Sequence, residues 1–122
     1  MSKGIDKKLD DIWRRIVLLR AGSKCEYCEN TTYLNAHHIF GRRNKSVRWV
    51  LANGVALCPL HHTFSSTFSA HQAPLEFVQW LIASRGEHWY DELRELANTP
   101  KKWTKNEKEI LLKKYKQMFD TM

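Results

Sequence analysis

Two short pairs of metal-ligand residues constrain this sequence more than any other feature. Cys25 and Cys28 form the first pair, and Cys58 and His61 form the second, with the same two-residue gap. Together they offer three thiolates and one imidazole, and thiolates select zinc or an iron–sulfur cluster over magnesium. A lone Cys-x-x-Cys would suit a redox pair or buried small side chains equally well. The second pair favours a structural zinc with a closed shell and no open position for chemistry.

The number of cysteines indicates the compartment. The chain has three, and an odd count argues against a disulfide framework. Its first residues, MSKGIDKKLDDIW, contain no apolar signal segment, and no apolar run approaches a membrane span. We therefore expect a cytoplasmic protein without a membrane partner, in a compartment where clustered cysteines more often bind metal than pair.

The apolar pattern predicts helices at both ends of a single domain of 122 residues. In segment 1–22 the apolar residues recur every three or four positions, as in a helix that ends before Gly22: Ile5, Leu9, Ile12, Ile16 and Leu19. Segment 73–122 is predicted to be a helical extension. Gly86 interrupts it, and Thr104 with Glu107 forms a capping box for the last helix.

The segment between them, 23–72, has short apolar runs broken by turn-forming residues. The run 55–57 follows Asn53-Gly54 and predicts a short strand. Pro59 is typical of a first helical position, so we expect a short helix that carries His61 and His62.

The net charge of +7 points to a polyanionic partner, most often nucleic acid. Segment 37–60 contains four basic residues and no acidic one, and these residues are expected to contact DNA phosphates: Arg42, Arg43, Lys45 and Arg48. The plainer interpretation is a solvated basic loop.

A second group of histidines lies around the cysteine pairs. His37 and His38 are adjacent, and adjacent residues of an extended segment point to opposite sides. One of them can therefore bind a metal while the other faces a substrate. His62 follows His61 directly and could be a further ligand or only an exposed neighbour. His88 lies in the helical extension and is expected to be structural or exposed.

In this order the residues resemble the HNH endonuclease signature. The matching elements are Cys-x-x-Cys at 25–28, His-His-Ile at 37–39, Asn53, and Leu-Cys-x-x-His-His at 57–62. Small HNH proteins with a helical tail are often phage-encoded, and this chain is similar to those. The resemblance implies an α+β fold: a ββα-metal (His-Me) finger stapled by zinc and flanked by N- and C-terminal helices.

The resemblance also implies roles for single residues. His38 would be the general base, and we expect its ring to face substrate rather than the core. Asn53 would brace the loop between the strands, and His37 and His62 would hold a catalytic Mg²⁺, Mn²⁺, Ni²⁺ or Zn²⁺. His71 could be a third ligand, as in some family members. The family commonly has a cysteine at the position of His61, so the roles of His61 and His62 could also be exchanged.

The sequence thus predicts a metal-dependent endonuclease that hydrolyses DNA phosphodiester bonds. Two alternatives stay open. One is a zinc-stapled nucleic-acid-binding module without catalysis, which would need neither His38 nor His62. The other is a phage packaging accessory protein that docks a phage partner through its C-terminal helices, in the host cytoplasm.

Overall fold

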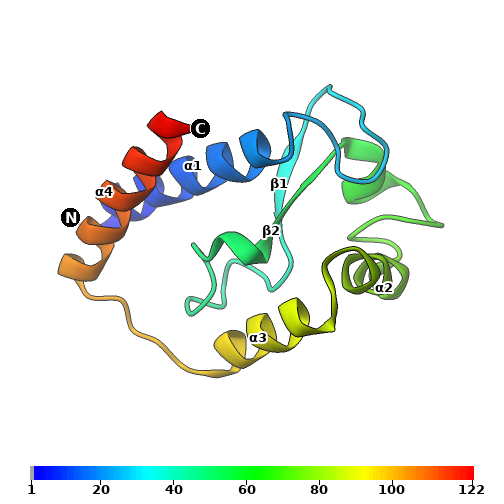
Figure 1. The fold of residues 1–122 in the computed structure, drawn as a ribbon. Coiled ribbons are helices and arrows are strands. Elements are labelled where there is room, and N and C mark those ends of the chain that lie inside the picture. Colours follow the sequence, from blue (N-terminus) through cyan, green and yellow to red (C-terminus); the bar gives the residue numbers. More distant parts are fainter. Residues whose placement is uncertain (1) are drawn as a thin grey trace.

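A two-stranded antiparallel sheet lies near the middle of the molecule, and helices surround it (Figure 1). The computed structural model describes residues 2–122, with side chains from residue 4 onward, so Met1 of the predicted first segment lies outside the described residues. The elements are α1 (Ser2–Arg20), β1 (Asn35–His38), the 3₁₀ turn η1 (Leu51–Asn53), β2 (Gly54–Leu57), the π-type helix η2 (Leu60–Phe64), α2 (Pro74–Arg85), α3 (Glu87–Asn98) and α4 (Lys105–Thr121). The predicted α+β class is confirmed in this form, mostly helical with a small sheet.

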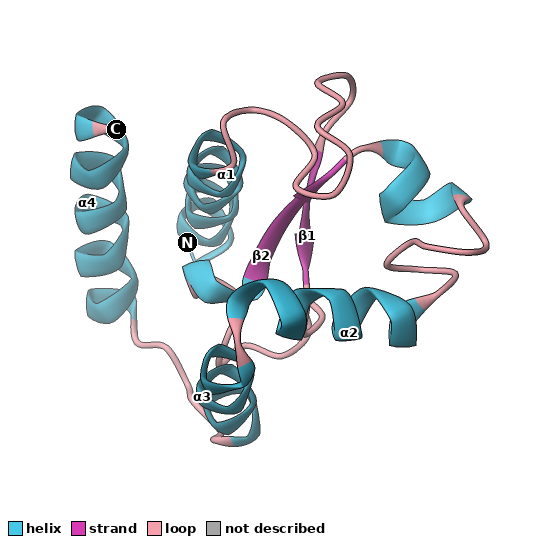
Figure 2. Ribbon diagram, turned by 45° about the vertical axis from the view of Figure 1, so that its right-hand side comes forward, coloured by secondary structure: helices cyan, strands magenta, loops and turns pink. Residues whose placement is uncertain are grey.

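The register of the sheet separates the two adjacent histidines. His37 pairs with Val55 and His38 pairs with Gly54. Because side chains alternate along a strand, His37 faces the side of α2, where it contacts Phe77. His38 faces the side of α1. Figure 2 shows the sheet between these helices.

Gly54 allows α1 to lie close to the sheet. A Cβ at this position would stand 2.5 Å from a methyl carbon of Val17 and 2.8 Å from the Trp13 ring. Both distances are too short for a real contact, so only glycine fits between the strand and the helix. The close approach of α1 brings the Trp13 ring to the face of the sheet that carries His38.

The buried face of α1 is wider than the sequence pattern predicted. Trp13 and Val17 are buried, whereas Leu19, which the pattern placed on the apolar stripe, is 38% exposed. The reason is that α1 packs against two neighbours at once, with the sheet on one side and α4 on the other. An apolar face predicted for packing against one neighbour therefore does not include all the residues that α1 buries.

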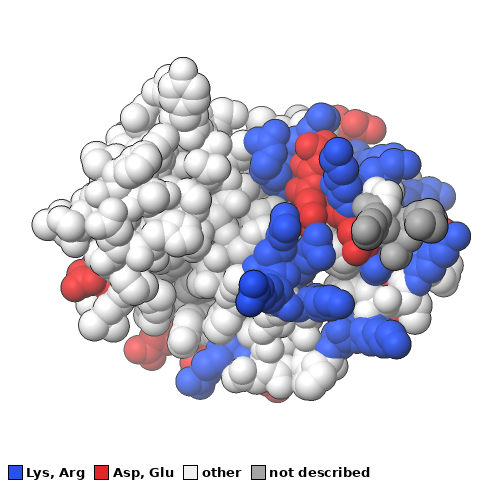
Figure 3. Space-filling model, turned by 180° about the vertical axis from the view of Figure 1, so that it is seen from behind, with Lys and Arg blue, Asp and Glu red and all other residues white. Residues whose placement is uncertain are grey.

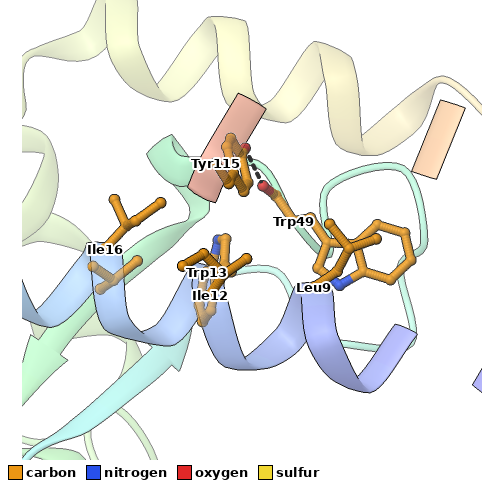
Figure 4. Packing of buried hydrophobic residues seen from close by; sticks show 7 residues of the cluster. Leu9, Ile12, Trp13, Ile16, Trp49 and Tyr115 are labelled. Carbon is orange, nitrogen blue, oxygen red and sulfur yellow. Dashed lines mark hydrogen bonds between the residues drawn. The ribbon is translucent and has the colours of Figure 1, made fainter. Parts of the chain in front are cut away.

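The C-terminal extension is part of the core. Tyr115 of α4 is buried and donates a hydrogen bond of 2.6 Å to the Trp49 carbonyl. Figure 4 shows this bond above four α1 side chains of the same cluster, Leu9, Ile12, Trp13 and Ile16, and Val17 of α1 also belongs to the cluster. The apolar face of α4 is thus already used within the molecule.

The predicted break at Gly86 and the predicted cap of the last helix are confirmed. Gly86 has a φ of +93°, which favours glycine, and it separates α2 from α3. Thr104 and Glu107 form the predicted capping box at the start of α4. Across the described residues, none of the helices combines the length and apolar character that a membrane crossing requires.

Candidate functional site: two metal-ligand clusters

Three cysteines and one histidine converge beside the end of β2. The donor atoms of Cys25, Cys28, Cys58 and His61 all lie within 4.8 Å of one another. The Sγ atoms of Cys28 and Cys58 are 3.6 Å apart. The Nδ1 atom of His61 lies 3.3 Å from Cys58 Sγ and 3.9 Å from Cys25 Sγ.

These spacings match a tetrahedral zinc shell. Zinc–sulfur bonds of about 2.3 Å and zinc–nitrogen bonds of about 2.0 Å, at tetrahedral angles, put two sulfurs roughly 3.8 Å apart and sulfur and nitrogen roughly 3.6 Å apart. The distances above lie within a few tenths of an ångström of these values. Cys25 and Cys58 are buried, so the cluster is anchored in the core. Its four residues therefore fit a structural zinc ion.

Two hydrogen bonds between Glu26 and Ala56, one of them to the Glu26 side chain, bring the two ligand pairs together. The Glu26 N–H donates to the Ala56 carbonyl at 2.9 Å, and the Ala56 N–H donates to the Glu26 carboxylate at 2.7 Å. The first pair is thereby fixed beside β2. The second pair follows from β2 directly, since Cys58 comes just after the strand and His61 lies in η2.

A second cluster consists of three histidines. The donor atoms of His37, His62 and His71 also lie within 4.8 Å of one another. The Nε2 atoms of His62 and His71 are 3.1 Å apart. Two imidazoles on one cation, with metal–nitrogen bonds of about 2.1 Å, place their nitrogens at about that separation. The three rings therefore fit one divalent cation that retains open positions.

The short helix η2 directs its two histidines to different clusters. His61 faces the thiols, and His62 faces His37 and His71. This grouping is the one that the sequence pattern favours, and the roles of the two histidines as ligands stay a prediction. His71 reaches the cluster because its N–H donates to the His62 carbonyl at 3.1 Å, next to a bond of 2.9 Å from Ala70 to His61.

Burial keeps His37 and His62 neutral. It is the largest cause that lowers the pKa of His37 to about 3, and the nearby His62 and His71 add to the effect. Burial also lowers the pKa of His62. A neutral imidazole has a free lone pair, so at neutral pH both rings are available as ligands.

His38 lies on the other face of the sheet, and its position differs from the expected one. Its ring is half-buried and stacks on Trp13, with ring centres 3.9 Å apart and planes 11° apart. Its Nε2 lies 3.0 Å from the Arg48 carbonyl, which can only accept, so Nε2 carries the proton. Nδ1 is then the nitrogen that can take up another proton. Burial lowers the pKa of His38, against the opposing effect of the Arg48 carbonyl, so the ring is neutral at neutral pH.

Asn53 ties down the loop that holds His38. Its buried amide oxygen accepts from the Phe40 N–H at 2.7 Å, and its amide nitrogen donates to the carbonyls of Phe40 at 2.9 Å and Val47 at 3.1 Å. Val47 directly precedes Arg48, whose carbonyl meets His38. The side chain of Asn53 therefore acts on His38 through this loop.

The four basic residues of the loop fall into two groups. Arg42, Arg43 and Lys45 are exposed. Arg48 is different, because its guanidinium binds the Asp10 carboxylate through two hydrogen bonds of 2.9 and 2.6 Å. Its side chain is only 18% exposed, so it is committed to holding the loop on α1 rather than free for a phosphate.

Two residues next to His38 were not predicted from the sequence. Trp13 supplies the ring on which His38 stacks, and Asp10 binds both Arg48 and the Trp49 indole N–H. The hydrogen bonds join residues 38 and 39 positions apart. Local periodicity carries no signal for such contacts.

Comparison with known proteins adds no relative. No protein-family model, curated protein or solved structure matches this chain. A functional interpretation therefore rests on the residues and their geometry.

Proposed function

We propose that this protein is a metal-dependent DNA endonuclease of the HNH type, built on a ββα-metal finger. In that interpretation the finger comprises β1, β2 and η2. The cysteine-rich cluster holds a structural zinc, and the three-histidine cluster holds the catalytic cation.

The observation that carries the proposal is the presence of two chemically different clusters in one small unit. The Cys₃His cluster has soft ligands and a full shell, so it suits a structural role. The second cluster has only imidazole ligands and leaves coordination positions for water and phosphate. A zinc-stapled binding module would need only the first cluster, so the three histidines favour catalysis.

The residues around the clusters suit phosphodiester hydrolysis. A divalent cation held by His37, His62 and His71 would polarise the phosphoryl oxygen and stabilise the leaving oxygen. His38 would accept the proton of the attacking water at Nδ1, because its Nε2 is occupied by the Arg48 carbonyl. Since His37 and His38 lie on opposite faces of β1, a phosphodiester that meets both must lie across this strand. Arg42, Arg43 and Lys45 follow closely and would hold the flanking phosphates.

Cleavage of a supercoiled plasmid tests the proposal. We expect nicked or linear DNA to form when Mg²⁺, Mn²⁺, Ni²⁺ or Zn²⁺ is added to dialysed protein. Chelator should prevent cleavage, because neutral imidazoles hold a cation weakly compared with three thiolates. DNA that stays intact with every cation, while the protein still binds it, would instead support the non-catalytic module.

A further inference from the structure

A basic pocket lies on the molecule away from both clusters, where the link between α3 and α4 crosses the loop after β1. Its volume is about 320 Å³. Five cationic side chains and one carboxylate line it: Lys45, Arg48, Lys101, Lys102, Lys108 and Asp6. Figure 3 draws one face of the molecule, and on it the Lys and Arg side chains gather over the half that contains α1 and α4, with few elsewhere.

Three hydrogen bonds fix the end of α3 and the link that follows it against the loop. Asn44 donates to the Ala97 carbonyl at 2.8 Å, and Ser46 donates to the Thr99 carbonyl at 2.6 Å. The indole N–H of Trp103 donates to the Lys45 carbonyl at 2.9 Å. Residues separated by more than fifty positions are thereby held side by side, so the pocket is a built feature of the fold.

The pocket keeps a positive charge after its ion pairs are counted. Arg48 pairs with Asp10, Lys101 with Glu107, and Lys108 with Asp6. Five cations thus face three carboxylates, which leaves an excess of two positive charges. Within the described residues, no carboxylate lies within ion-pair distance of Lys45 or Lys102.

Two tryptophans hold the cations rather than offer free ring faces. The Lys101 ammonium lies 4.6 Å from the centre of the Trp103 ring, and the Lys108 ammonium lies 5.7 Å from that of Trp49. Both distances are within the range of cation–π attraction. With the rings engaged in this way, the pocket offers positive charge rather than a surface for base stacking.

We propose that this pocket binds a backbone phosphate of the nucleic acid, on a stretch beyond the one that reaches the histidines. Lys45 connects the two regions, because it belongs to the basic loop after His38 and also lines the pocket. The choice of a nucleic-acid phosphate as the ligand rests on the proposed function. The pocket would extend the contact with DNA along one side of the molecule.

DNA binding without added divalent cation separates this proposal from catalysis. A duplex of about 30 base pairs is roughly 100 Å long, which exceeds the width of a domain of this size. Fluorescence anisotropy would compare wild type with Lys101→Ala/Lys102→Ala. The matched control is Lys113→Ala/Lys114→Ala, which removes two exposed lysines of α4 outside the pocket.

We expect the pocket variant to reduce the slope of log K against log salt by about one unit, the value for one phosphate contact. Its affinity near 0.1 M salt should fall about tenfold, and the control should stay within about twofold of wild type. Lys102→Glu, which breaks no ion pair of the described residues, should weaken binding in the same direction.

Equal losses in the pocket and control variants would overturn the proposal, because net charge alone would then explain them. Unchanged binding in the pocket variants would overturn it as well. A wild type that binds through the pocket but cuts under no condition would contradict the nuclease and leave the pocket standing. If wild type cleaves DNA normally and the pocket variants bind DNA as tightly as wild type, the nuclease proposal stands and the pocket proposal is wrong.

Discussion

Replacing Cys58 by alanine is expected to abolish zinc binding and to unfold the protein or lower its Tm by at least about 15 °C. Binding of a structural zinc contributes roughly 10 kcal/mol or more in small zinc domains, which is comparable to the whole stability of a domain. Loss of even about 4 kcal/mol of stability would lower the Tm of a chain of this length by about 15 °C. Thermal unfolding monitored by circular dichroism, with zinc content measured on the same sample, checks this result.

Cys28→Ala serves as the matched variant, because Cys28 is exposed whereas Cys58 is buried. Its substitution removes a ligand with little loss of packing. Both variants should therefore lose zinc and stability together. A stable Cys28→Ala protein without zinc would mean that the cysteine cluster is ordinary core packing.

Replacing His38 by alanine is expected to reduce DNA cleavage by about a hundredfold or more, the usual scale for loss of a general base. DNA binding should persist, since the exposed basic residues are unchanged. The variant should also lose about 1 kcal/mol of stability, because the ring stacks on Trp13. His38→Gln is a useful companion, since its amide can still donate to the Arg48 carbonyl but cannot act as a base.

Plasmid cleavage and urea unfolding should be measured on both variants. His88→Ala is the control, because this histidine is 87% exposed and pairs only with Glu92 within the described residues. It should cut DNA like wild type. If His38→Gln retains wild-type cleavage, the proton is taken up by another group.

The parts of this structure that could be predicted are those set by local spacing. The two-residue gaps of the ligand pairs, the alternation of His37 and His38, and the capping box at Thr104 depend on neighbours a few positions away. Each appears in the structure where the sequence placed it. Such features need no knowledge of the tertiary fold.

The parts that could not be predicted depend on contacts between distant segments. The sequence left His71 as one possible third ligand, and its place beside His37 and His62 depends on its backbone hydrogen bond to His62 of η2. The commitment of Arg48 to Asp10 follows from the packing of α1 on the loop, and no local pattern signals it. Likewise, the apolar residues of α4 have the same helical spacing whether the helix packs on α1 or on another protein, so the sequence does not identify its partner. The structure shows it packed on α1.

The most direct test of the account is cation-activated plasmid cleavage by dialysed His62→Ala protein that has kept its zinc. Because His62 faces His37 and His71 rather than the thiols, the variant should retain one zinc ion and its fold. Its cleavage should fall by about a hundredfold or more with every added cation, since loss of a ligand removes several kcal/mol of charge stabilisation. If this zinc-retaining variant cleaves DNA at the wild-type rate, the three histidines do not hold a catalytic cation.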